Sequence, residues 1–171
     1  MAHYGGNRPL NLYAATKQAF SDLLAYYTDA DFLRAVTLVL SDTYGPGDLR
    51  PKILNLVKKA AQTGEKLAMS DGNQDYDVVH IDDVVQAFRQ AGEQLLQTPQ
   101  WKNETFQVSS LHPLTLRQTV EELCRVNGWS LNADWGARPP VEREIRKAVR
   151  LYPPVPGWTP TVPLDEGLRC I

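Results

Sequence analysis

Hydrophobic positions in the first forty residues predict a helix followed by a buried strand. In residues 11–28 apolar side chains recur at helical spacing, and residues 35–40 form a short, almost uninterrupted apolar run. Such a run is typical of a strand buried on both faces of a parallel sheet. A helix that leads into a strand of this kind is the second half of a strand-helix-strand crossover, so the pattern indicates an α/β fold.

Helical and strand patterns alternate along the rest of the chain. We expect helices at residues 51–63, 84–96 and 115–126, and strands at residues 66–70, 78–81 and 104–108. Gly64 and Asn127-Gly128 are typical helix C-termini. Asp82 and Asp83 stand where they cap the helix that follows them. The last forty residues are rich in proline, and we expect them to wrap the surface.

The loop after the first strand is the best candidate for binding a ligand. Residues 42–48, Asp-Thr-Tyr-Gly-Pro-Gly-Asp, are dense in turn-forming residues. Open α/β sheets bind their ligands at the carboxyl ends of parallel strands, which is where this loop lies.

Tyr13 and Lys17 form a candidate acid/base pair on the first helix. Residues four apart share a helix face, so the ammonium can lie near the phenol and favour its ionised form. Taken alone, a tyrosine and a lysine at this spacing are more often a solvated or half-buried contact than a catalytic pair.

Composition and charge exclude several classes of protein. A chain of 171 residues is expected to form one domain, and its net charge of -2 gives no reason to expect a nucleic-acid partner. No apolar run approaches the roughly 20 residues of a membrane span, and no basic segment precedes an apolar one, so we expect a cytoplasmic protein without membrane contact.

Cys124 and Cys170 are unclustered and expected to be free thiols. His80, Asp82 and Asp83 are read as structural residues rather than metal ligands.

Five stretches in order resemble a known family. They are YAATK, DTYGPGD, DGNQDYDVVHIDDVVQAF, FQVSSLHPLTLRQTVEEL and GWTPTVPLDEGL. Together they make the chain similar to the C-terminal half of an extended short-chain dehydrogenase/reductase, in the NAD-dependent nucleotide-sugar epimerase/dehydratase group. The loop variant Asp-Thr-Tyr-Gly, with Asp48, Arg50 and Lys52 after it, resembles the branch of CDP-abequose and paratose synthases.

The resemblance implies a partial doubly wound, Rossmann-like parallel sheet that lacks its N-terminal half, with a small α/β substrate-binding lobe. Residues 1–48 are expected to be the remnant of the dinucleotide-binding sheet. Residues 49–171 are expected to be mainly substrate lobe, with sheet elements that return. The resemblance implies NAD or NADP as cofactor and a nucleotide sugar as substrate.

The resemblance also assigns roles to residues. Tyr13 exchanges a proton with the sugar, and Lys17 holds the nicotinamide ribose and favours the phenolate. Leu40, Ser41 and Thr43 are expected beside the cofactor. The residues expected to contact the substrate are Asp42, Arg50, Lys52, Tyr76 and Arg138.

Two of these substrate positions depart from the family pattern. Asp42 replaces the usual asparagine, and a carboxylate facing a diphosphate is repulsive unless it is paired. Tyr76 stands where the family often has an arginine. For Arg50 and Lys52, a solvated helix start is the simpler interpretation.

The sequence contains no strand followed by a glycine-rich dinucleotide-binding turn, because Gly5-Gly6 precede a helix with no strand before them. Three explanations stay open: a folded but inactive fragment, one half of a split enzyme that associates with a separate N-terminal half, and a non-enzymatic binding or oligomerisation module. The unpaired edge left on the strand at residues 35–40 is a liability for association. The resemblance implies a homodimer through residues 12–27.

Overall fold

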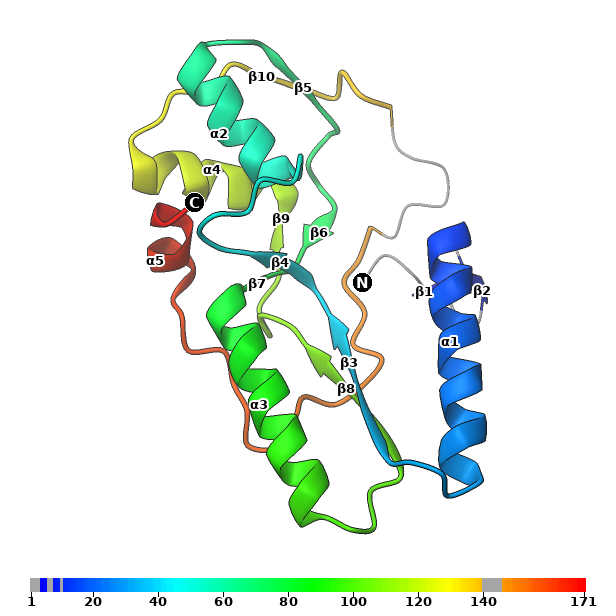
Figure 1. Ribbon diagram of the computed structural model, residues 1–171. Coiled ribbons are helices and arrows are strands. Elements are labelled where there is room, and N and C mark those ends of the chain that lie inside the picture. The colour runs from blue at the N-terminus through cyan, green and yellow to red at the C-terminus, as the bar shows by residue number, and fades with distance from the viewer. Residues whose placement is uncertain (1–3, 6–7, 10, 140–145) are drawn as a thin grey trace.

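The computed structural model of the chain describes residues 4–5, 8–9, 11–139 and 146–171. Figure 1 shows an elongated molecule with an upper lobe around α2, α4 and α5 and a lower layer around two long strands. The helices are α1 (Leu12–Asp29), α2 (Ile53–Thr63), α3 (Ile81–Gln97), α4 (Leu116–Asn127) and α5 (Leu164–Arg169). The strands are β1 (Tyr4–Gly5), β2 (Arg8–Pro9), β3 (Ala35–Leu40), β4 (Asp42–Tyr44), β5 (Leu67–Met69), β6 (Asp75–Tyr76), β7 (Val78–His80), β8 (Asn103–Val108), β9 (Leu114–Thr115) and β10 (Ala133–Trp135).

The lower layer is built on the parallel pair β3 and β8. Their register runs from Ala35 opposite Asn103 to Leu40 opposite Val108. Helix α3 lies on one side of this pair and α1 on the other (Figure 1). The apolar side chains of α3, β7, β8 and the C-terminal segment form a core here. Its buried members are Val79, Val84, Ala87, Ala91, Phe106, Val108, Val155 and Trp158.

Strand β3 differs from the prediction in its burial. Its parallel pairing is as expected, but all six of its residues are only half-buried, where the apolar run predicted burial on both faces. The reason is that α1 covers the strand poorly: Ala14 and Thr28 are the buried residues of that helix. Among the described strands, β3 pairs only with β8.

The upper lobe has its own core between α2, α4 and α5. Strands β5 and β10 pair in parallel at its outer end, although residues 133–135 were not predicted as a strand. Two further pairs connect the lobes: β4 with β7 in parallel, and β6 with β9 antiparallel. The buried core residues are Tyr44, Leu54, Val57, Met69, Val78, Leu116, Val120, Leu123 and Leu168.

The C-terminal forty residues do more than wrap the surface, so that prediction was wrong in part. Val155, Trp158 and Leu168 are fully or almost fully buried. The Trp158 Nε1–H donates to the Asp83 carbonyl at 3.1 Å, which fixes the indole against α3.

The start of α3 also corrects a prediction. The N-cap is His80, whose Nδ1 accepts the Asp82 N–H at 3.3 Å. Asp82 and Asp83 therefore lie in the first turn, where acidic side chains still suit the helix dipole. The predicted C-termini are confirmed: Gly64 and Gly128 have φ of 74° and 65°, the left-handed region that favours glycine.

Candidate functional site

Tyr13 and Lys17 lie near the start of α1. The helix begins there because the Asn11 side chain accepts the Ala14 N–H at 2.8 Å. The Lys17 Nζ lies 5.4 Å from the centroid of the Tyr13 ring, so the two side chains share a face as their spacing predicted. The ammonium stands over the ring, which is a cation–π arrangement. Tyr13 is 58% exposed.

The carboxyl end of β3 is held by an aspartate that the sequence analysis did not single out. The Ser41 hydroxyl donates to Asp77 Oδ2 at 2.5 Å, and Asp77 Oδ1 accepts the Ser110 N–H at 2.9 Å. Asp77 thereby joins the end of β3 to the loop after β8. Ser41 is buried and its hydroxyl is engaged, so it positions the strand end. The position of Asp77, directly between β6 and β7, was the available indication.

Asp42 is paired rather than facing open solvent alone. The Lys52 Nζ lies 3.3 Å from Asp42 Oδ1, and it also donates to the Thr43 carbonyl at 3.3 Å. This pair removes the repulsion that a lone carboxylate would present to a diphosphate. Lys52 is thus a bridge between α2 and β4 rather than a solvated helix start.

Arg50 is engaged by Asp48 through two hydrogen bonds of 2.7 Å. These bonds from Arg50 lower the pKa of Asp48 to about 2. The Arg50 side chain remains 61% exposed, so solvent screens the pair and a phosphate can compete for the guanidinium.

Tyr76 places a neutral hydroxyl where the resemblance suggested an arginine. It lies in β6 opposite Leu114. Burial raises the pKa of Tyr76 well above its usual range, and the nearby carboxylates of Asp42 and Asp48 add to the effect. Tyr76, Lys52 and Thr43 line the same small cavity. At neutral pH this position therefore offers a hydrogen-bond donor without charge.

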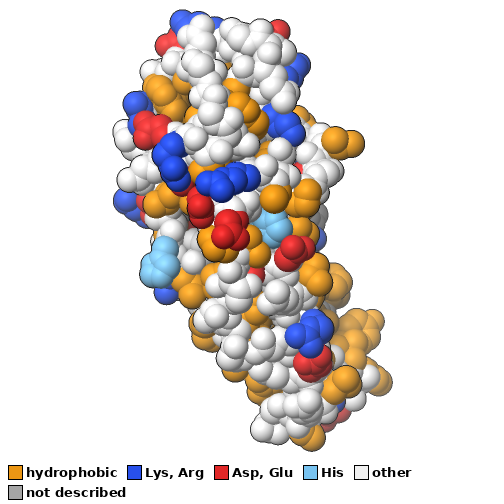
Figure 2. Space-filling model, turned by 90° about the vertical axis from the view of Figure 1, so that its left-hand side faces the viewer, with side chains coloured by type: hydrophobic (Ala, Val, Ile, Leu, Met, Phe, Trp, Pro, Cys, Tyr) orange, Lys and Arg blue, Asp and Glu red, His pale blue; other side chains and the backbone are white. Residues whose placement is uncertain are grey.

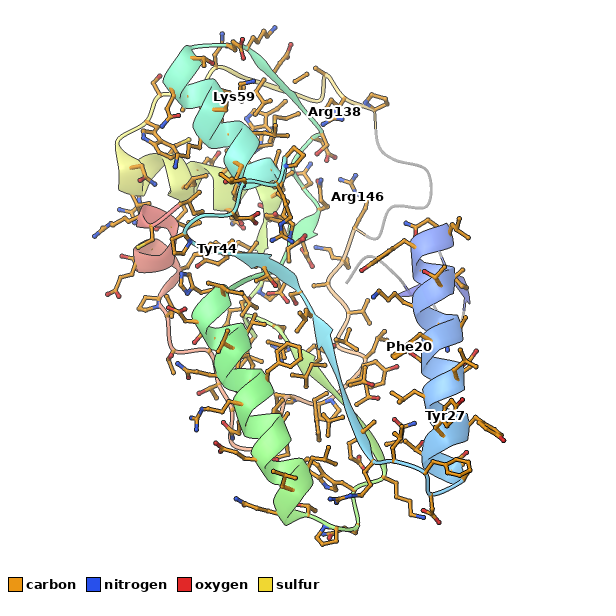
Figure 3. All side chains as sticks on the ribbon, viewed as in Figure 1. Phe20, Tyr27, Tyr44, Lys59, Arg138 and Arg146 are labelled. Atoms are coloured by element: carbon orange, nitrogen blue, oxygen red, sulfur yellow. The ribbon has the colours of Figure 1, made fainter. Side chains whose placement is uncertain are left out.

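Arg138 and Arg146 lie on the same side of the upper lobe (Figure 3). The Arg138 backbone N–H donates to the Met69 carbonyl at 2.9 Å, and its side chain is exposed. Arg146, which the sequence analysis did not select, donates to both oxygens of Asp71 at 2.8 and 2.6 Å. Arg138 thus carries the more accessible guanidinium of the two.

On the side of the molecule shown in Figure 2, acidic, basic and histidine side chains are interspersed across the middle instead of forming one charged patch. Within residues 4–5, 8–9, 11–139 and 146–171, no three His, Cys, Asp or Glu side chains group as metal ligands. None of the helices in the described part of the chain combines the length and apolarity needed to cross a membrane. Cys124 is half-buried and Cys170 exposed, and both are free thiols.

Comparisons with known proteins bear on this geometry. The sequence model of the NAD dependent epimerase/dehydratase family matches residues 1–108. Over 122 residues, 71% of this chain and 41% of the relative, the sequence is 30% identical to CDP-abequose synthase of Yersinia pseudotuberculosis.

Solved structures superpose on almost the whole chain. UDP-glucose 4-epimerase of Thermus thermophilus, in complex with NAD, has a TM-score of 0.77 at 21% identity, covering 98% of this chain and 58% of the epimerase. The dTDP-glucose 4,6-dehydratase of Bacillus anthracis, in complex with NAD, has a TM-score of 0.73 at 19% identity, covering 99% of this chain and 54% of the dehydratase. These superpositions confirm the α/β, Rossmann-like fold class. The chain spans about half the length of the proteins it matches.

Proposed function

Because the chain belongs to the NAD dependent epimerase/dehydratase family, we propose that it carries the catalytic tyrosine and the substrate lobe of an NAD(P)-dependent nucleotide-sugar epimerase, dehydratase or reductase. The observation that carries this proposal is the contact between Lys17 and Tyr13 on α1, inside the matched residues. In this division, residues 1–48 belong to the dinucleotide-binding sheet and residues 49–171 mainly to the substrate lobe.

Tyr13 is the acid/base in this proposal. Its phenol exchanges a proton with a sugar hydroxyl or carbonyl, and the Lys17 ammonium lies on the same helix face, over the Tyr13 ring. When bound, the nicotinamide supplies hydride exchange at the same sugar carbon.

The residues present fit one end of a dinucleotide. Lys17 is exposed and has three donors for the ribose hydroxyls. Leu40, Ser41 and Thr43 lie at the carboxyl end of β3, where such sheets bind ligands. Ser41 acts through its bond to Asp77, which holds the loop in place.

On the substrate side, we assign the diphosphate of a nucleotide sugar to Lys52, Arg50 and Arg138. Lys52 shares its charge with Asp42, while Tyr76 donates a neutral hydrogen bond. This set carries less net positive charge than a pair of free arginines, so we expect moderate affinity. The similarity to CDP-abequose synthase supports a CDP-linked sugar.

Calorimetric titration of the chain with CDP-, UDP- and dTDP-glucose, and with NAD(H) and NADP(H), tests this assignment. We expect binding of the CDP sugar and a five- to tenfold weaker affinity in Lys52→Ala, on the order of one charge-assisted hydrogen bond. Lys59→Ala, an exposed lysine on the same helix, is the matched control. If no nucleotide sugar binds, or if both variants weaken it equally, the substrate-lobe assignment fails.

We propose that turnover also requires a strand-helix-strand half beside β3. The chain spans 41% to 58% of the length of the compared relatives. Apolar side chains stand exposed on α3, beside β3, at Val85 and Phe88. A doubly wound sheet covers such faces with the helices of its neighbouring strands.

Adding a dinucleotide-binding half in trans tests the enzymatic role directly. We expect NAD(P)-dependent conversion of the sugar nucleotide, abolished by Tyr13→Phe and retained by Tyr26→Phe on the same helix. If the chain binds the sugar nucleotide and the Tyr13→Phe variant behaves like wild type in this assay, the second candidate function, a non-enzymatic module, is supported instead. The exposed apolar face of α1 favours a homodimer in either case.

A further inference from the structure

A cavity of about 370 Å³ lies on the side of the molecule formed by α5 and the N-terminal end of α3. The loop after β8 (residues 110–114) and the segment 159–164 form much of its wall. Of the residues assigned above to cofactor or substrate, only Tyr76 lines it.

Tyr44 presents a buried hydroxyl to this cavity. The residue is 6% exposed and extends from β4 toward α5 (Figure 3). No hydrogen bond of its hydroxyl is found among the described residues, although a buried hydroxyl normally has a partner. Burial, and then the charge of Asp83, raises the pKa of Tyr44 to about 12. The hydroxyl therefore remains a donor at neutral pH.

His80 presents a second donor beside Tyr44. It is 6% exposed, and its ring lies edge-on to that of Tyr44 with centroids 5.4 Å apart. Because Nδ1 accepts the Asp82 N–H, the proton of the neutral ring is on Nε2. Within the described part of the chain, Nε2 has no hydrogen-bond acceptor.

Gly167 packs against both rings. A Cβ at Gly167 would lie 2.4 Å from the Tyr44 hydroxyl oxygen and 3.1 Å from His80 Cδ2. A side chain at this position would collide with the Tyr44 hydroxyl, so glycine is what lets both rings pack against α5.

The carboxylate in the wall, Asp83, is already engaged in hydrogen bonds. The Asp83 carboxylate, almost completely buried, accepts the Thr161 N–H and hydroxyl at 2.8 and 2.9 Å and the Val162 N–H at 3.2 Å. An anionic ligand would meet the negative charge of Asp83, and a cationic one would find that carboxylate satisfied and two donors facing it. Val78, Val79 and Leu164 supply apolar surface.

We propose that this cavity binds a small neutral molecule through a carbonyl oxygen that accepts hydrogen bonds from the Tyr44 hydroxyl and His80 Nε2–H, with its apolar body against Val78 and Leu164. A carbonyl oxygen has two lone pairs and brings no proton that needs an acceptor, which matches two donors beside an occupied carboxylate. The site is independent of the proposed reaction at Tyr13.

Titration of the ¹⁵N-labelled chain with cyclohexanone, followed by amide chemical shifts, tests the proposal. We expect saturable shifts at residues 110–114 and 159–164 at millimolar ligand. Methylenecyclohexane replaces the carbonyl oxygen with a CH₂ group, and it should bind to the wild-type chain about three- to tenfold more weakly than cyclohexanone. Cyclohexanone should bind to Tyr44→Phe more weakly than to wild type by the same factor. Three- to tenfold is the range expected for the loss of one neutral hydrogen bond.

His80→Asn provides a second variant that keeps the helix cap and removes the Nε2 donor. It should weaken cyclohexanone by a similar factor, while Tyr26→Phe on α1 should leave it unchanged. Three results would each overturn the proposal. They are chemical-shift changes that map to other residues, no shift changes at the cavity at 10 mM cyclohexanone, and equal affinity for cyclohexanone and methylenecyclohexane. Failure of nucleotide-sugar binding leaves these readouts unaffected, so the two proposals fail separately.

Discussion

At the scale of single residues, the partner of each polar side chain decides what that side chain can do. Asp42 is neutralised by Lys52, Asp48 by Arg50, and Asp77 is used to position Ser41. The sequence marked most of these positions but not their pairings, because the partners come from neighbouring elements in space. A charge count along the chain therefore overstates the positive charge available to a ligand.

Asp83 illustrates a carboxylate whose role is structural. Asp83→Asn should lower the free energy of unfolding by about 2–4 kcal/mol, because it removes the buried negative charge and sets an amide NH₂ against an N–H donor of the C-terminal segment in place of one carboxylate oxygen. Asp82→Asn, an exposed neighbour in the same helical turn, should cost less than ~1 kcal/mol. Urea unfolding followed by circular dichroism measures both. Equal losses would show that helix capping, as predicted from the sequence, dominates at these positions.

The burial of Tyr44 predicts how the stability of the fold changes at alkaline pH. Its folded-state pKa is about 12, above the value of about 10 expected when unfolded, so between these values the unfolded chain binds fewer protons. The free energy of unfolding should therefore fall as pH rises from 10 to 12, by about 2–3 kcal/mol more in wild type than in Tyr44→Phe, at ~1.4 kcal/mol per pH unit. Tyr26→Phe, on an exposed tyrosine, should follow wild type. Parallel profiles for all three proteins would contradict the burial of this hydroxyl.

At the scale of elements, the sequence predicted those that have strong local determinants. The three central helices were located within a few residues, since Gly64 and Gly128 end two of them in the left-handed conformation. The predictions missed the two-residue strands β6 and β9, because a strand that short has no periodicity to detect. The proline-rich end was misread because composition does not reveal that Trp158 and Leu168 enter the core.

One of those missed elements, β6, holds the segment at residues 146–148 through a carboxylate. The pKa of Asp75 is lowered chiefly by the Ala148 N–H it accepts, and then by Lys147. A depressed folded-state pKa means that this contact stabilises the fold above the ordinary aspartate range and is lost as pH falls through the lower value.

The Ala148 amide should therefore lose hydrogen-exchange protection as pH falls below about 4, relative to amides of β8. Asp75→Asn should produce the same loss at neutral pH. Asp134→Asn, which removes an exposed pair with Lys66 in the upper lobe, is the control and should leave Ala148 unchanged. Protection of Ala148 that is independent of both pH and Asp75 would rule out this attachment.

At the scale of the whole molecule, the exposed apolar faces determine which other chains the protein can bind. Helix α1 buries little of itself against the rest of the described chain, and large apolar side chains recur along its outer face at successive spacings of eight, three and four residues. They are Leu12, Phe20, Leu23 and Tyr27. Figure 3 labels two of them on the helix. Isolated apolar residues on a surface need no explanation, but a stripe along a helix is typical of an interface.

We expect this stripe to form the homodimer that the family resemblance suggested, by isologous packing of α1 against its copy. Leu23→Lys should shift the chain from dimer to monomer, raising the dimer dissociation constant at least a hundredfold, because it places a charge at the centre of the stripe. Asp22→Lys introduces the same side chain at the next position, off the stripe, and should leave the dimer intact. Light scattering at micromolar concentration distinguishes the states. A wild-type monomer at that concentration would contradict the α1 dimer interface. The exposed face of α1 would then be left for the dinucleotide-binding half, since a doubly wound sheet places helices beside α1 as well as strands beside β3.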